Sequence, residues 1–268
     1  MSILRAGAAR LQRPSGVILY EGPSLLDGAP IVVIATGLWR PSENPKTGPM
    51  VQTWILRQDV NPFGAIHAGQ DVSVCGDCPL RGILARMRGR CTVNRGRACY
   101  VNVHQAPLAV WRQYRRGHHV RFDRRQHLPL FRGRMLRIGS YGDPCAAPYS
   151  VWAPLARVAA GHTGYTHQWQ DSRFDGFRRI LMASVESLEQ ASDARARGWR
   201  TFRSAVSGEQ PARGEFSCPA SAENGHRLTC DRCGACNGAN GRPGRASVVI
   251  WAHGGTPVLA SYRRTMGF

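Results

Sequence analysis

The chain has 268 residues, of which 43% are hydrophobic, so it can bury a sizeable core, and wholesale disorder is excluded. Its formal net charge is +19, carried almost entirely by arginine, since Lys46 is the only lysine. No apolar run reaches the roughly eighteen residues that cross a membrane, and no apolar segment follows Arg5 and Arg10 before Pro14 as in a signal peptide. We therefore expect a cytoplasmic protein with no membrane partner.

The first half of the chain is predicted to contain two strands, a cysteine-rich loop and a helix. Residues 1–30 form an irregular lead-in punctuated by glycine and proline. Apolar, β-branched runs predict neighbouring strands at Ile31–Gly37 and Met50–Leu56. Residues 69–99 are expected to be irregular unless a metal fixes their shape. A helix is predicted at about Pro107–Arg116, since proline suits a first turn.

From there on, strands alternate with helices. Strands are predicted at Met135–Ser140, Thr163–Gln168, Leu181–Glu186, Trp199–Val206 and Ser247–His253. Helices are predicted at Pro148–Ala160 and at Leu188–Arg197, the second of which ends before Gly198. This alternation indicates a parallel sheet. The expected fold is therefore α/β, a partial (β/α) barrel or a curved, mostly parallel sheet with two cysteine-rich metal-binding loops.

The chain is expected to form one globular unit built from five consecutive segments. These are an N-terminal β-rich segment (1–68), a first cysteine-rich metal loop (69–105), an α/β core (106–207), a second cysteine-rich metal loop (208–245), and a closing strand and tail (246–268). The oligomeric state is not predicted.

Eight of the nine cysteines form two groups, and cysteine groups in a cytoplasmic protein are more often metal ligands than disulfides. The C-terminal group is Cys218, Cys230, Cys233 and Cys236. Its C-x2-C-x2-C run offers three thiolates from one loop, which suits the separate corners of a 4Fe-4S cluster. Structural zinc, which usually takes two separated pairs of ligands, is the alternative.

The N-terminal group is less regular. It consists of Cys75, Cys78, Cys91 and Cys99, of which the first two form a C-x2-C pair. If all four bind, the site is closed and either structural or electron-transferring. If only three bind, one iron stays open for a substrate or cofactor. The expected cofactors are therefore one or two 4Fe-4S clusters, with zinc as the alternative at either site.

A strongly basic stretch separates the two cysteine groups. Between Arg81 and Arg137 there are fifteen arginines and one acid, Asp123. Such an excess favours a polyanionic partner, and aromatic residues stand among the charges as in a surface that stacks bases and binds phosphate. The predicted nucleic-acid ligands, for DNA or RNA, are Arg112, Arg115, Arg116, Arg121, Arg124 and Arg125. A solvated basic face is the alternative.

Polar residues follow the predicted strands, and ligands of parallel sheets bind beyond the carboxyl ends of the strands. Asp143, His167 and Glu186 are the predicted catalytic residues, which would bind the ligand or move protons. The predicted cofactor-binding residues are Ser140, Gly142, Asp143 and Gln168. Asp143 as a turn or N-cap residue, and His167 as a hydrogen-bonded core histidine, remain the alternatives. Cys145 is expected to be a small buried hydrophobe.

Several of these segments together resemble a known family. They are Cys99-Tyr100, Gly139–Asp143, Thr163–Trp169, Leu181–Ser187, Gly198–Arg200 and the closing cysteine run that begins at Cys218. Their order resembles an uncharacterised family of phage and mobile-element gene products, which are in turn similar to radical S-adenosylmethionine (SAM) proteins.

The resemblance implies a partial (β/α) barrel and makes SAM a possible cofactor. Asp143 would then stand where radical SAM proteins contact the methionine amine. The chain departs from those proteins in lacking their C-x3-C-x2-C loop. Cys75, Cys78 and Cys99 would have to take its place, with Cys91 left out or closing the site.

These observations favour an iron–sulfur protein of phage or plasmid type that binds nucleic acid and modifies it. The alternative is a non-catalytic nucleic-acid-binding protein in which zinc or iron–sulfur sites are structural. A small-molecule enzyme with an incidental basic face ranks last. Cleavage of SAM by the reduced protein distinguishes the enzymatic hypothesis from the other two.

Overall fold

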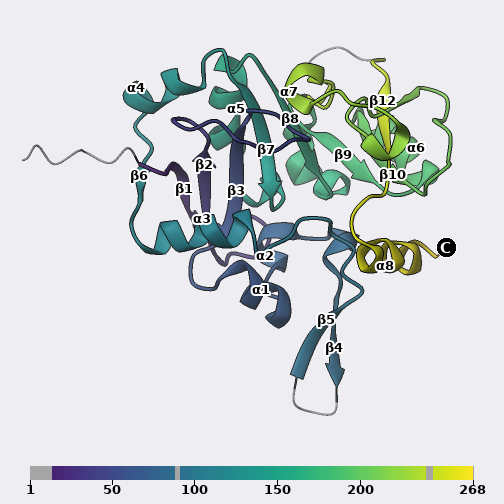
Figure 1. Ribbon diagram of the computed structural model, residues 1–268, viewed down its shortest axis with the longest axis horizontal. Helices are drawn as coiled ribbons and strands as arrows, with labels where there is room; N and C mark the ends of the chain where they lie inside the picture. The colour runs from purple at the N-terminus through teal and green to yellow at the C-terminus, as the bar shows by residue number, and fades with distance from the viewer. Residues whose placement is uncertain (1–13, 88–90, 240–243, 268) are drawn as a thin grey trace, which may run out of the picture.

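A computed structural model of the chain describes residues 14–87, 91–239 and 244–267 (Figure 1). Ten strands form one sheet in the order β11-β12-β10-β9-β8-β7-β3-β2-β1-β6. The strands span Gly16–Pro23 (β1), Pro30–Thr36 (β2), Val51–Arg57 (β3), His119–Arg121 (β6), Met135–Tyr141 (β7), Gly161–Thr166 (β8), Met182–Val185 (β9), Thr201–Ala205 (β10), Glu215–Ser217 (β11) and Ser247–Trp251 (β12). Neighbours are parallel from β11 through β3 and between β1 and β6, whereas β2 is antiparallel to both its neighbours. The prediction of an α/β fold with a mostly parallel sheet is confirmed.

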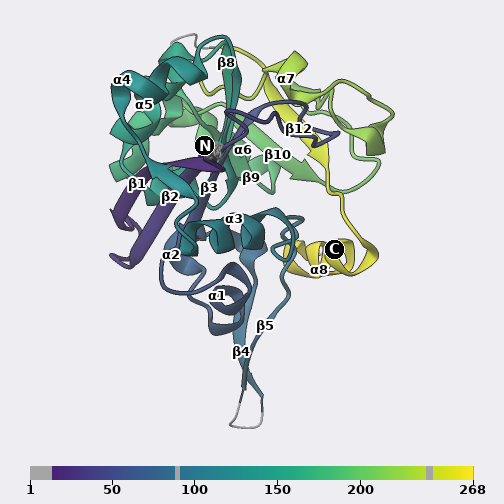
Figure 2. The same cartoon turned by 60° about the vertical axis from the view of Figure 1, so that its left-hand side comes forward.

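Helices and a separate hairpin surround this sheet. The helices are Pro62–Ala68 (α1), Val72–Cys75 (α2), Ala106–Arg115 (α3), Arg124–His127 (α4), Tyr149–Val158 (α5), Leu188–Ala196 (α6), Cys230–Cys233 (α7) and Thr256–Met266 (α8). The hairpin pairs Ile83–Met87 (β4) with Cys91–Arg95 (β5). Figures 1 and 2 show α1, α2 and the hairpin on one side of the sheet, with the hairpin projecting from the body. Within the described residues, no helix combines the length and apolar character needed to cross a bilayer.

Each strand or helix that was predicted between β2 and β12 begins and ends within two residues of the observed element. Three expectations were wrong. The lead-in holds β1, which pairs with β2, although residues 1–13 lie outside the described part. The first cysteine segment holds α2 and the β4–β5 hairpin instead of an irregular loop. The expected tail forms α8, whose first turn holds Pro257.

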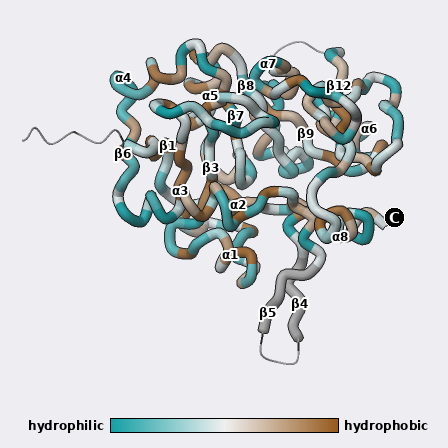
Figure 3. Tube along the Cα trace, viewed as in Figure 1, coloured by the Kyte–Doolittle hydropathy of each residue, from teal (hydrophilic) through white to brown (hydrophobic). Residues whose placement is uncertain are grey.

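The centre of the sheet is buried on both faces, as parallel strands require. Residues Ile31–Ala35 of β2 are fully buried, and α5 covers the sheet with the buried side chains of Trp152 and Leu155. Figure 3 shows hydrophobic residues along the strands, whereas α4 is coloured as hydrophilic. Because β7, β8, β9, β10 and β12 are parallel, their carboxyl ends lie at one edge of the sheet.

A buried ion pair joins β10 to the edge strand β11. Arg203 Nη2 lies 2.8 Å from Glu215 Oε2, and the two side chains are 1% and 0% exposed. Arg203 also pairs with Glu209. Burial alone would raise the pKa of Glu215, but hydrogen bonds from Arg203 and from the backbone N–H of Ala212 overcome this and lower it from 4.5. The pair therefore stabilises the fold fully above pH 4.5 and loses its effect as pH falls through the lowered pKa.

We predict that Arg203→Met destabilises the protein by about 3–5 kcal/mol, because it leaves the Glu215 carboxylate buried without its partner. The double variant Arg203→Met/Glu215→Leu should recover most of this loss. Urea unfolding monitored by circular dichroism at neutral pH measures both. If the single variant were no less stable than the double variant, the pair would not hold β11 in place.

Candidate metal centres and ligand cavity

A cavity of about 160 Å³ lies at the carboxyl edge of the parallel strands. The strands contribute residues Gly139–Asp143, Tyr165, His167, Ser184, Phe202, Ser204 and Ile250 to its wall. The opposite wall comes from the first cysteine segment and from α8, which supplies Val258, Leu259 and Tyr262. Tyr262 is fixed there because its hydroxyl donates to Ser204 Oγ at 3.0 Å.

Three thiols of the N-terminal group line this cavity together: Cys75, Cys78 and Cys99. Cys75 ends α2, and Cys78 precedes the single turn Pro79–Arg81 (η1). The hairpin returns the chain so that the N–H of Cys99 donates to Leu80 O at 2.9 Å, close to Cys78. Local folding therefore brings together residues 75, 78 and 99 although two dozen positions separate the outer ones.

Cys91 has a different position. It pairs with Met87 at the end of the hairpin farthest from the Ile83–Arg95 pair, and its side chain lies outside the described part of the structure. The hairpin projects from the body in Figure 1. The structure thus groups three of the four predicted N-terminal ligands and places the backbone of the fourth at the hairpin tip. The eight cysteines whose side chains are described are all free thiols.

Two side chains near the three thiols carry buried hydrogen-bond donors that have no hydrogen-bond acceptor. Arg97 lies 3.6 Å from Asp71 and is electrostatically coupled to Cys75 and Cys99, yet neither of its terminal nitrogens has a hydrogen-bond acceptor. The hydroxyl of Tyr141 is also buried without a partner. Burial raises the pKa of the Cys75 thiol well above its usual value, and the charges of Cys78 and Asp71 raise it further. An anionic group bound by the thiols would satisfy these donors.

The four C-terminal cysteines line a second, small cavity of about 20 Å³. Cys218 follows β11 and donates its N–H to Val249 O at 2.8 Å, while α7 carries Cys230 and Cys233. Burial raises the pKa of Cys218 to about 11 and that of Cys236 to about 12. All four predicted ligands are therefore neighbours around one space.

Neither group is arranged around a single point. Among the described residues, no set of three or more His, Cys, Asp or Glu side chains is placed to hold a metal ion. A zinc ion needs its sulfur ligands about 2.3 Å from one centre. The thiolates of a 4Fe-4S cluster bind separate irons and surround a larger core. Both zinc and a cluster therefore remain alternatives for the two groups of cysteines.

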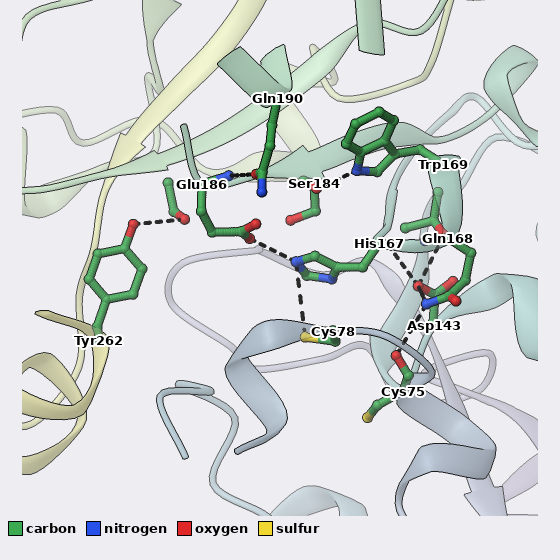
Figure 4. A network of polar contacts seen from close by, with 12 residues as sticks. Cys75, Cys78, Asp143, His167, Gln168, Trp169, Ser184, Glu186, Gln190 and Tyr262 are labelled. Atoms are coloured by element: carbon green, nitrogen blue, oxygen red, sulfur yellow. Dashed lines mark hydrogen bonds and ion pairs between the residues drawn. The ribbon is translucent and has the colours of Figure 1, made fainter. Parts of the chain in front are cut away.

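Asp143 is a positioning residue and not a free catalytic acid. Its Oδ2 accepts hydrogen bonds from Thr166 Oγ1 at 3.0 Å, from His167 N at 2.8 Å and from Gln168 Nε2 at 3.3 Å (Figure 4). Its Oδ1 accepts from Cys145 N at 3.0 Å. Three of these donors saturate Oδ2 and one reaches Oδ1, so the geometry favours the turn role that the sequence left open. Cys145 is fully buried, as expected.

His167 and Glu186 form a pair at the cavity wall. His167 Nε2 lies 2.8 Å from Glu186 Oε1 and 4.0 Å from Cys78 Sγ. Figure 4 shows the imidazole between the carboxylate and the thiol. Burial alone would lower the pKa of His167, but the charges and hydrogen bonds of Cys78 and Glu186 raise it well above its usual value. Of the pair, His167 lines the cavity, and Glu186 contacts it through His167.

The predicted cofactor-binding residues divide into two kinds. Ser140 and Gly142 line the cavity, and Ser140 donates its hydroxyl to Gln52. Gln168 is buried outside the cavity lining and donates to Cys75 O at 3.3 Å as well as to Asp143. Gln168 therefore ties the first cysteine segment to the end of β8, and its assignment as a cofactor contact is not supported by its position.

All six predicted nucleic-acid ligands are exposed along α3, β6 and α4. We call the surface that they form the basic face, and its residues are Arg112, Arg115, Arg116, Arg121, Arg124 and Arg125. The aromatic side chains among them are half-buried. Trp111 Nε1 donates to Arg57 O at 3.0 Å, and the Tyr114 hydroxyl donates to Glu21 at 2.8 Å. These rings anchor the basic face to the core, so they are not free to stack on bases as expected.

Sequence reasoning missed several residues of the cavity. Tyr262 fell in the tail after the closing strand, for which no helix was predicted, although the apolar spacing of Val258, Leu259 and Tyr262 is typical of a helix face. Arg97 was counted only as part of the basic stretch. Its position two residues before Cys99 was the available signal that it serves the thiols instead.

We predict that Gly142→Ala is more destabilising than Gly133→Ala. Both glycines have a positive φ, +83° and +68°, so both substitutions cost about 1–2 kcal/mol of backbone strain. At Gly142 a Cβ would also lie 2.7 Å from Ile55 Cβ and 3.0 Å from Ile55 O, whereas at Gly133 it meets nothing within 4 Å. The clash should add about 1–3 kcal/mol in urea unfolding. Equal losses would show that the turn at Gly142 can move away from β3.

Comparison of the chain with known protein families, curated proteins and solved structures finds no match in any of the three. What the protein does is therefore inferred from its own side chains: two groups of buried or half-buried thiols, a cavity at the carboxyl edge of a parallel sheet, and an exposed basic face.

Proposed function

We propose that this chain is an iron–sulfur protein that binds nucleic acid and modifies it with SAM as cofactor. Cys75, Cys78 and Cys99 would hold a 4Fe-4S cluster whose fourth iron opens to the cavity. One observation carries the proposal. Three half-buried thiols share the wall of one cavity, and the buried terminal nitrogens of Arg97 and the buried hydroxyl of Tyr141 lack a hydrogen-bond acceptor, although Arg97 lies within ion-pair distance of Asp71.

The residues around the cavity support chemistry that needs protection from water. A bound cluster of this kind supplies single electrons to SAM, which is the source of radical chemistry. His167 holds a proton at Nε2 on the cavity wall, with Glu186 as its hydrogen-bond partner. Asp143 and Gln168 fix the turn after β8 and the loop of Cys75, so they hold the thiols against the strand ends. We propose that the sheet here serves as the partial (β/α) barrel that the sequence resemblance implies.

The C-terminal group supports a second, closed site. Four thiols line its cavity, which matches the four ligands of a cluster with no open iron. The Tyr165 side chain hydrogen-bonds to Cys236 and lines both cavities. A structural or electron-transferring role follows from this closed arrangement.

The basic face supports the nucleic-acid part of the proposal. Its six guanidinium groups are exposed on adjacent elements, and among the described residues only Arg121 of these six forms an ion pair with a carboxylate, Glu21 at 2.8 Å. Arginine binds phosphate in a bidentate manner, so such a surface suits a sugar-phosphate backbone.

We predict that anaerobically purified protein contains about eight iron and about eight sulfide per chain and cleaves SAM after reduction. Cys78→Ala and Cys233→Ala should each remove about half of the iron, and Cys78→Ala should also abolish SAM cleavage. Cys91→Ala is the matched control and should keep both properties. Iron and sulfide assays with chromatography of the SAM products measure the outcome.

Two results would contradict the proposal in different ways. Colourless protein with two zinc ions would support the non-catalytic binding protein instead. Fully reconstituted, reduced protein that leaves SAM intact would remove the enzymatic part while keeping the iron–sulfur part.

We predict that replacing Arg112, Arg115 and Arg116 by Gln weakens nucleic-acid binding and flattens its dependence on salt. Each lost phosphate contact should reduce the slope of log K against log salt by about 0.7 for single strands and about 0.9 for duplex. Fluorescence anisotropy with random-sequence DNA and RNA measures both quantities. An unchanged slope would place the contact on another surface.

A further inference from the structure

A third cavity, of about 270 Å³, adjoins the cavity of about 160 Å³ that Cys75, Cys78 and Cys99 line. The two share wall residues, among them Tyr100, Ser140, Tyr165, Phe202 and His253. The described residues that line the larger cavity include two cations, Lys46 and Arg137, and no Asp or Glu. A space next to the three thiols is therefore walled by positive charge without balancing carboxylates.

Arg137 is the central cation of this cavity. It lies on β7 between Gln52 of β3 and Thr163 of β8, where the sheet holds its backbone fixed. Its Nη2 donates to the Tyr100 hydroxyl at 3.0 Å. No carboxylate of the described residues lies within ion-pair distance of it, whereas most other half-buried arginines of the fold have one. Arg137 thus keeps donors available for an anion.

Lys46 reaches the same space from the loop between β2 and β3. Its Nζ lies 3.8 Å from Glu223 Oε2, and both side chains are about one-third exposed (34% and 37%), so this is a weak, partly solvated pair. An anion in the cavity would meet a mobile ammonium group from Lys46 opposite the fixed guanidinium of Arg137.

Helix α3 connects this cavity with the basic face. Gln105, Ala106 and Pro107 at its amino end line the cavity, where the helix dipole adds positive potential. Its last turn carries Arg112 and Arg115 of the basic face. A ten-residue helix is about 15 Å long, so a strand bound on the basic face can extend to the cavity within a few nucleotides.

Part of the remaining wall is aromatic and suits a nucleobase, beside polar residues and the thiols of Cys218 and Cys230. Tyr165 and Phe202 lie with ring centroids 4.4 Å apart, and Tyr100 lies 4.9 Å from the ring of His253. Tyr100 is 47% exposed, which leaves much of it uncovered at the junction of the two cavities. Exposed aromatic rings bind bases by stacking, with little dependence on sequence.

We infer that the cavity of Lys46 and Arg137 binds the phosphate of one nucleotide of the nucleic-acid substrate, and that the base of this nucleotide lies against Tyr100 at the entrance to the thiol-lined cavity. This inference rests on the proposed function and names the part of the substrate that reaches the reacting centre. Enzymes that modify a base must take it out of its stack, and a fixed phosphate beside an aromatic ring holds it there. Arg137 is a binding residue in this assignment.

The test uses anaerobically purified full-length protein and calorimetric titration with the four 5′-mononucleotides and the matching nucleosides. At least one mononucleotide should bind, and its nucleoside should bind more weakly by about tenfold or more. Arg137→Gln and Lys46→Gln should each weaken mononucleotide binding, with Arg137→Gln having the larger effect. Arg157→Gln, which removes an exposed arginine of α5 away from both cavities, is the matched control and should bind as the parent does.

The outcomes separate this inference from the proposed function. Replacing Arg112, Arg115 and Arg116 should weaken binding of an oligonucleotide but not of the mononucleotide. Mononucleotide binding that is absent, or unchanged in both Arg137→Gln and Lys46→Gln, would overturn the inference even if the basic face binds nucleic acid. The inference would also be overturned if the Arg137→Gln variant lost iron and the parent protein bound no nucleotide. In that case Arg137 would serve to balance the charge of Cys230. An oligonucleotide that binds no more tightly than the mononucleotide would show that the ligand is a free nucleotide.

Discussion

The carboxylate of Asp143 holds the candidate site in one shape. It accepts hydrogen bonds from residues after β7 and after β8, so it ties two neighbouring strand ends together. Gln168 extends the same network to the backbone of Cys75. Burial raises the pKa of Asp143, and its hydrogen-bond donors act against that increase. A buried carboxylate is costly unless it is fully hydrogen-bonded, which explains why the turn after β7 is built around its four donors.

The cysteine side chains differ from Asp143, because they bind metal only when they are deprotonated. Burial raises the pKa of Cys75, Cys99, Cys218, Cys230 and Cys236, so at these positions the protein environment alone favours neutral thiols. A bound metal centre reverses that preference, because it deprotonates its sulfur ligands and supplies the positive charge that they lack. Under the proposed function, the binding free energy of the metal centres would then contribute to the folding of both cysteine segments.

Much of the fold could be predicted from the sequence, because its buried strands are short apolar runs and its helices carry local signals such as Pro107 and Gly198. The strand β1 was missed because glycine and proline on either side of it suggest a loop, while its pairing with β6 depends on residues about a hundred positions away. The site was predicted as a set of residues but not as a set of roles. That Asp143 accepts four hydrogen bonds, and that Cys99 joins Cys75 and Cys78 while Cys91 lies at a hairpin tip, depends on how the chain turns back on itself. Spacing along the sequence carries no information on such contacts.

Both outer strands of the large sheet are very short. β6 and β11 have three residues each, although they border a sheet of ten strands. Short borders offer few unpaired backbone groups on which a foreign strand can add itself. Arg121 at the end of β6 also adds a charge to one border. Strand addition from one molecule to the next is therefore disfavoured at the β6 and β11 borders of the large sheet.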